Sequence, residues 1–178
     1  IECLTEIDPQ LADCIKLLES LNRLDLESRK GKAPGGYNYP LYETGVPFIF
    51  MNSTGQLRDL VTMVHESGHA VHSVLTHNLP FYELKSCPSE VAELASMSME
   101  LITMEHWHHF IKDEKELTRA KVEHLTGIIE ILPWIATIDA FQHWVYENPT
   151  HTVAEREENW KRIYEKFASP VIDWKGFE

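Results

Sequence analysis

The chain has 178 residues, of which 16 are basic and 28 acidic, so its formal net charge is -12. Apolar residues make up 43% and charged residues 25% of the chain, which is typical of one globular domain and not of a disordered chain. The acidity argues against nucleic-acid binding, which needs clustered Lys and Arg, and the lack of an unbroken apolar run of about 18 residues argues against a membrane span.

The first predicted element is a helix from about Asp8 to Ser28. Asp8 and Pro9 have the pattern of an N-cap followed by proline in the first turn, and apolar residues then recur at helical spacing. The helix should end before residues 31–42, which are rich in glycine and tyrosine. These residues lack the Gly-Lys-Ser/Thr ending of a phosphate-binding loop. We expect a surface loop, with contact to a substrate as the alternative.

The strongest strand prediction covers Pro47–Asn52. Its sequence, Pro-Phe-Ile-Phe-Met-Asn, is short, aromatic and β-branched, and turn-forming residues bound it. A helix is predicted next, over about Gly55–His77. Ser53 and Gln56 form a capping-box pattern at its start, and Pro80 stops it.

The second half of the chain predicts three more helices, over about residues 88–112, 113–146 and 153–167. Asp113 is placed to cap the middle helix, and Pro133 should kink it. Thr152 and Glu155 form a capping box before the last helix. We therefore expect a mainly α-helical fold with one short strand or hairpin, organised as a single domain over residues 1–178.

The predicted helix over 55–77 contains the motif His65-Glu66-Ser67-Gly68-His69. Histidines four residues apart lie on one face of a helix, so both imidazoles can bind a single metal ion. The carboxylate of Glu66 can then reach a water molecule on that metal and act as general base in peptide hydrolysis. Two surface histidines on an ordinary helix are the simpler alternative, but the motif lies in mid-helix on a partly apolar face.

A catalytic zinc site needs a third protein ligand and keeps its fourth position for water. The metzincin pattern is excluded, because Leu75 stands where that pattern requires histidine. A following antiparallel helix would pass the metal about ten residues after its start, at 1.5 Å per residue. Glu90, Glu93 and Glu100 all lie near that level, and the spacing does not choose between them.

These segments together resemble the metal core of the thimet oligopeptidase and oligoendopeptidase F family of zinc peptidases. The resemblance rests on five segments between residues 31 and 144: Pro34–Tyr37, Pro47–Asn52, His65–His72, Val91–Ser96 and Asp139–Trp144. It implies a zincin-like helical catalytic core that holds zinc through His65, His69 and Glu93. Glu66 would activate the water, and Glu100 would orient a ligand histidine.

The resemblance also implies that the strand over Pro47–Asn52 is an edge strand along which an extended peptide lies, the alternative being an ordinary core strand. His72 shares the helix face of His65 and His69. As a fourth ligand it would close the site and make it structural, whereas the resemblance favours contact with substrate or with a ligand residue. The remaining cluster, His106, His108 and His109, is expected at a solvated helix end.

The sequence thus predicts a zinc-dependent metalloendopeptidase that hydrolyses short peptides. Family members are several times longer and use histidine and tyrosine residues beyond the metal core to stabilise the oxyanion, and this chain has no matching cluster. Because oxyanion donors are a large part of catalysis, we expect a fragment that binds zinc but cleaves peptides poorly. The alternative from another class is a helical interaction or scaffold domain with a closed structural zinc site.

The cysteine pattern bears on the cellular compartment. Cys3, Cys14 and Cys87 are too widely spaced for a metal knuckle or a disulfide framework. No signal peptide opens the chain at Ile1. A reducing, cytoplasmic location is therefore expected.

Overall fold

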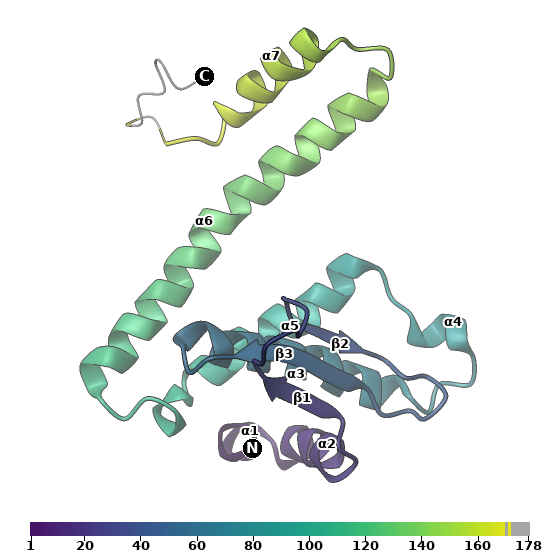
Figure 1. Ribbon diagram of the computed structural model, residues 1–178, viewed down its shortest axis with the longest axis vertical. Helices are drawn as coiled ribbons and strands as arrows, with labels where there is room; N and C mark the ends of the chain where they lie inside the picture. The colour runs from purple at the N-terminus through teal and green to yellow at the C-terminus, as the bar shows by residue number, and fades with distance from the viewer. Residues whose placement is uncertain (170, 172–178) are drawn as a thin grey trace. The chain divides into compact units, whose positions relative to one another are not determined.

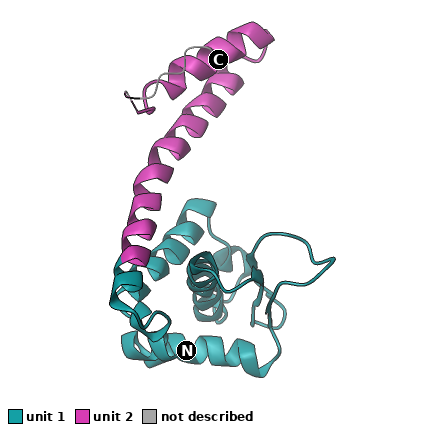
Figure 2. Ribbon diagram, turned by 60° about the vertical axis from the view of Figure 1, so that its left-hand side comes forward, with its two compact units in different colours: residues 1–118 teal, residues 119–178 magenta. Residues whose placement is uncertain are grey.

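The computed structural model describes residues 1–169 and 171 (Figure 1). The chain forms two compact units, residues 1–118 and the residues from 119 on (Figure 2). The segments predicted to hold the metal all lie in the first unit.

The first unit is mainly helical, as predicted, but its sheet has three strands where one strand or hairpin was expected, and one of them lies within the predicted loop of residues 31–42. Its elements in chain order are α1 (Glu2–Ile7), α2 (Pro9–Ser20), β1 (Leu24–Glu27), β2 (Tyr37–Tyr39), β3 (Phe48–Ser53), α3 (Leu57–Thr76), α4 (Tyr82–Lys85), α5 (Ser89–Met104) and the 3-10 helix η1 (Trp107–His109). The buried core joins α2, β3, α3 and α5 and includes Leu18, Ile49, Val71 and Met99.

The first predicted helix begins as expected but ends early. The Asp8 carboxylate accepts a hydrogen bond of 2.8 Å from the backbone N–H of Gln10, which caps α2. After α2, Asn22 takes a positive φ of 54°, and the chain turns into β1. The prediction of helix through Ser28 is wrong there, because pairing of β1 with β3 overrides the local helical pattern.

The strand over Pro47–Asn52 is confirmed as β3, but it is not an edge strand. The sheet order is β1-β3-β2, with β3 parallel to β1 and antiparallel to β2. Both edges of β3 are therefore hydrogen-bonded, and its residues Ile49 and Met51 are buried in the core. The prediction that a peptide lies directly along β3 is wrong, and the edge position next to it belongs to β2.

The loop between β1 and β2 is fixed to the sheet by Lys32. Its side chain is only 1% exposed. The ammonium group donates to the carbonyl oxygens of Met51 at 2.5 Å and Glu27 at 2.8 Å, and to the Asp25 carboxylate at 3.0 Å. At the other end of the loop, the side-chain amide of Asn52 donates to the Gly35 carbonyl at 3.0 Å. The loop therefore lies on the surface, as expected, and is held in place against the sheet.

The start of α3 is capped differently from the prediction. Asp59 Oδ2 accepts from the backbone N–H groups of Thr54 and Gly55, both at 2.6 Å, and of Gln56 at 2.9 Å. Gln56 is thus the N-cap residue, and Asp59 supplies the carboxylate of the box. The predicted pairing of Ser53 with Gln56 is wrong, since the helix begins three residues later than that pairing requires.

The second unit contains most of α6 (Glu114–Glu147), which runs on through Pro133, and α7 (Val153–Tyr164). The predicted capping box of α7 is confirmed, because the Thr152 N–H donates to the Glu155 carboxylate at 2.7 Å. Trp160 of α7 packs edge-on against Phe141 of α6 at a ring distance of 5.0 Å.

Helix α6 exposes much of its apolar surface, including Ile129 and Leu132. Its most apolar 18-residue window has a mean hydropathy of 1.2, and 6% of that window is buried. By length and composition alone the helix could cross a membrane. The absence of a membrane segment therefore stays a prediction.

Candidate metal centre

The site is built where α3 and α5 approach each other at Gly68. A Cβ atom on Gly68 would lie 2.7 Å from Ser96 Cα and 2.7 Å from the Ala95 carbonyl oxygen. Such contacts are too short for any other residue, so glycine allows the two helices to come this close. The approach brings carboxylates of α5 to the level of the histidines on α3.

Three side chains converge there. Glu93 Oε2 lies 3.2 Å from His65 Nε2 and 3.7 Å from His69 Nε2. One ligand atom from each of the three residues can be chosen so that all lie within 4.8 Å of one another. Ligands in a tetrahedral zinc site, with bonds near 2.0–2.1 Å, are separated by about 3.3 Å. Two imidazoles and a carboxylate at these separations fit a zinc ion with an open fourth position.

Glu100 lies behind the site and contacts the other nitrogen of His65. Its Oε1 is 2.6 Å from His65 Nδ1. This hydrogen bond is the main reason why the pKa of His65 is raised. A carboxylate in this place fixes the ring so that Nε2 faces Glu93, which is the arrangement common behind metal-bound histidines. By contrast, burial lowers the pKa of His69.

Glu66 is buried beside the three residues. Burial raises the pKa of its carboxyl group, while the nearby His65 and the backbone of Asn38 act in the opposite direction. Its Oε2 is buried without a hydrogen-bond partner in the described part of the chain. A buried oxygen without a hydrogen-bond partner destabilises the folded protein unless a bound water molecule or ion satisfies it. A water molecule held by a metal would satisfy it.

The other predicted residues lie outside the group of three. His72 lines a pocket of about 210 Å³ together with His69, Tyr42 and Cys87. Glu90 is exposed at the start of α5. Of the three carboxylates that the spacing left open, Glu93 is the one grouped with both histidines.

Several residues that shape the site lie in the segments that carry the resemblance, but the sequence had assigned them no role. Ser96 is fully buried, and its hydroxyl donates to Glu93 Oε2 at 2.9 Å. Gly36 has a similar role to Gly68, since a Cβ there would lie 3.0 Å from the Thr62 methyl group and 3.7 Å from Glu66 Oε1. A serine three residues after a candidate ligand was a usable signal, because residues at that spacing share a helix face. The two glycines gave no comparable signal.

Comparison with known protein families agrees with the resemblance. A sequence profile described as Peptidase family M3 matches residues 12–175. The chromosomal oligoendopeptidase F of Lactococcus lactis subsp. cremoris is 39% identical over 93 residues, which are 52% of this chain and 15% of that protein. The oligopeptidase PepF of Bacillus subtilis is 37% identical over 93 residues, which are 52% of this chain and 14% of that protein.

Comparison with solved structures extends the similarity to nearly the whole chain. A structure of PZ peptidase A with an inhibitor superposes with a TM-score of 0.86 and 33% sequence identity. The match covers 98% of this chain and 31% of that one. The chain thus spans less than a third of the length of these relatives.

Proposed function

The chain belongs to peptidase family M3, and from this membership we propose that it provides the metal centre of a zinc-dependent oligoendopeptidase that hydrolyses short peptides. One observation carries the proposal. His65, His69 and Glu93 are grouped at metal-ligand separations beside the buried, unpartnered oxygen of Glu66. The names of the relatives, which are oligopeptidases, support the substrate class.

The arrangement of the site suggests separate roles for the metal ion and for Glu66. Zinc at this position would polarise a water molecule and the carbonyl group of the scissile bond. Glu66 accepts a proton from the attacking water on its free Oε2 and then gives it to the leaving nitrogen. Burial of Glu66 favours this transfer, because a less solvated carboxylate holds a proton more readily.

The position of β2 suggests how a peptide reaches Glu66. The backbone of Asn38 lies close enough to Glu66 to lower the pKa of its carboxyl group, and Asn38 is in register with Ile49 of β3. The open edge of β2 therefore lies beside the proposed base. An extended peptide paired with this edge would be held by main-chain hydrogen bonds, which accept varied side chains. We accordingly assign the substrate edge to β2 in place of β3.

The proposal includes an open coordination position on the metal. His72 lies outside the group of three ligands, so it is not assigned as a fourth ligand that would close the site. We assign it to the wall of the pocket next to His69, in reach of substrate. The cytoplasm is the proposed location, supported by three free cysteines, of which Cys3 and Cys14 are buried.

Two measurements test this function. The zinc-loaded chain should bind a peptide hydroxamate, because a hydroxamate needs an open metal position, whereas a closed structural site would not bind it. The variant Glu66→Gln should keep its zinc and lose peptide cleavage, and Glu90→Gln should change neither. We expect cleavage by the 178-residue chain to be slow, so it is measured against a blank without protein. Undiminished cleavage by Glu66→Gln would remove Glu66 from the proposed role.

A further inference from the structure

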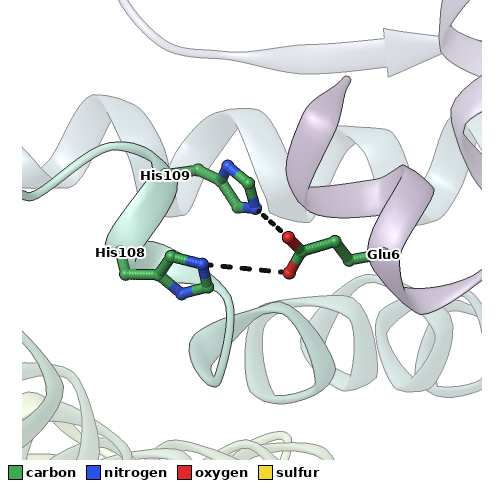
Figure 3. A group of neighbouring side chains, drawn as sticks. All are labelled: Glu6, His108 and His109. Atoms are coloured by element: carbon green, nitrogen blue, oxygen red, sulfur yellow. Dashed lines mark ion pairs between the residues drawn. The ribbon is translucent and has the colours of Figure 1, made fainter.

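A second cluster of potential metal ligands lies at the other end of α5, away from the proposed peptidase site. Glu6 of α1 faces His108 and His109 of η1, and one ligand atom from each residue lies within 4.8 Å of the others (Figure 3). The sequence had placed these histidines at a solvated helix end. Instead, they gather around one carboxylate that is about a hundred residues away in the chain.

The separations between these atoms suit a small divalent ion. Glu6 Oε1 is 2.9 Å from His109 Nε2, and Glu6 Oε2 is 3.8 Å from His108 Nε2. These two distances end on different oxygens of Glu6. With one ligand atom taken from each residue, all three atoms lie within 4.8 Å of one another, and the ligand atoms of a tetrahedral zinc site lie about 3.3 Å apart. The two imidazole rings lie 4.5 Å apart and point their nitrogens toward the same carboxylate.

His109 lies between two carboxylates. Its Nε2 is buried and forms an ion pair with Glu6 Oε1 at 2.9 Å. The opposite nitrogen, Nδ1, faces the carboxylate of Glu2 at 3.4 Å. In the peptidase site, His65 is likewise placed between a carboxylate behind it and the ligand group in front of it. This pattern is the usual support for a metal-bound histidine.

His106 completes the arrangement. Its Nδ1 lies 2.8 Å from Glu6 Oε2 and so helps to fix the carboxylate.

We infer that Glu6, His108 and His109 form a second site for a divalent transition-metal ion such as Zn²⁺. The nitrogen-rich ligand set selects zinc or its neighbours over Mg²⁺ and Ca²⁺, which prefer all-oxygen sites. The bound ion joins the N-terminal helix α1 to η1 and so acts as a structural link. The side chains of Glu6 and His108 are half exposed, so an ion can reach the site from solvent.

The experiment uses the variant His65→Ala/His69→Ala, in which the peptidase site cannot contribute. Equilibrium dialysis at low micromolar free Zn²⁺ should give one zinc per chain. Adding Glu6→Gln or His109→Ala should lower the zinc affinity at least tenfold, while adding His143→Ala, at an exposed histidine of α6, should leave it unchanged. Unchanged melting temperature in EDTA shows that each variant is folded.

A second readout does not depend on stoichiometry. Zinc should slow amide hydrogen exchange in α1 of the His65→Ala/His69→Ala protein, and Glu6→Gln should abolish that effect. The site is overturned if the double variant binds no zinc, if its zinc is unaffected by Glu6→Gln, or if α1 exchanges at the same rate with and without zinc. Because the peptidase ligands are already removed, neither result depends on the proposed function.

Discussion

The hydroxyl of Ser96 donates a hydrogen bond of 2.9 Å to the Glu93 carboxylate one turn away on α5. The same oxygen of Glu93 faces the Nε2 atoms of both His65 and His69. Ser96 is fully buried, so water cannot replace its hydrogen bond. Ser96 therefore positions the third ligand of the proposed zinc site.

Replacing Ser96 with alanine should weaken zinc binding about tenfold, the lower end of the effect expected for groups that orient metal ligands. The melting temperature of the zinc-free protein should fall only slightly. Competition with a chromophoric chelator measures the affinity. The matched control is Ser98→Ala on the same helix, for which zinc affinity should not change. Equal affinities for Ser96→Ala and the parent would show that Glu93 needs no such support.

Glu100 should matter through His65. The variant Glu100→Gln keeps the shape of the side chain but removes the charge that faces His65 Nδ1 at 2.6 Å. We expect zinc affinity to fall about 10- to 100-fold. The pKa of His65 in the zinc-free protein should also fall, because the hydrogen bond to Glu100 is the main cause of its raised value. NMR titration of the ring protons measures this, and an unshifted titration would contradict the positioning role.

Gly68 sets the distance between α3 and α5. In Gly68→Ala the new methyl group would lie 2.7 Å from Ser96 Cα, so the helices must separate. Overpacking of this kind costs about 1–3 kcal/mol in the free energy of unfolding. Zinc affinity should fall as well, because Glu93 moves away from the histidines. Gly127→Ala on α6, where a Cβ meets nothing within 4 Å, is the control and should not destabilise the protein.

Lys32 should be important for stability. The variant Lys32→Met removes a buried ammonium group and leaves the backbone carbonyls of Asp25, Glu27 and Met51 without this donor. The Asp25 carboxylate keeps its hydrogen bonds from Arg29. Leaving buried acceptors without a donor costs about 1–3 kcal/mol in the free energy of unfolding. Urea denaturation measures it. Lys30→Met, at an exposed position in the same loop, should have a much smaller effect.

Asp25 gives a prediction about pH. Hydrogen bonds from Arg29 and then Lys32 hold the pKa of Asp25 well below its usual value in the folded protein. A depressed pKa contributes stability above the pKa of the unfolded chain, and this contribution is lost as the pH falls. The difference in melting temperature between the parent and Asp25→Asn should therefore be constant near neutral pH and shrink below about pH 4. A difference that grows on acidification would contradict this.

The local part of the site could be predicted from the sequence. Helical periodicity located α3 and α5, and the spacing of four residues placed His65 and His69 on one face. The choice among Glu90, Glu93 and Glu100 could not be made from spacing, because it depends on how closely two helices approach. Gly68 sets that approach through its neighbours on α5, which no local pattern contains.

Contacts between residues far apart in the sequence explain the other differences between the predicted and the observed structure. Leu24–Glu27 looked like the end of a helix, and only its parallel partner β3, more than twenty residues later, makes it a strand. The same partner, together with β2, puts β3 in the middle of the sheet. The histidines at 106–109 were read as a solvated helix end, since Glu6 lies about a hundred residues before them.

The most direct test of the proposed metal centre is the zinc content per chain of the parent and of Glu93→Ala after dialysis against a weak chelator. Both are made in the Glu6→Gln background, so that zinc at the second site does not count. We predict close to one zinc per chain for the parent and almost none for Glu93→Ala. Equal zinc contents would contradict the assignment of Glu93 as the third ligand.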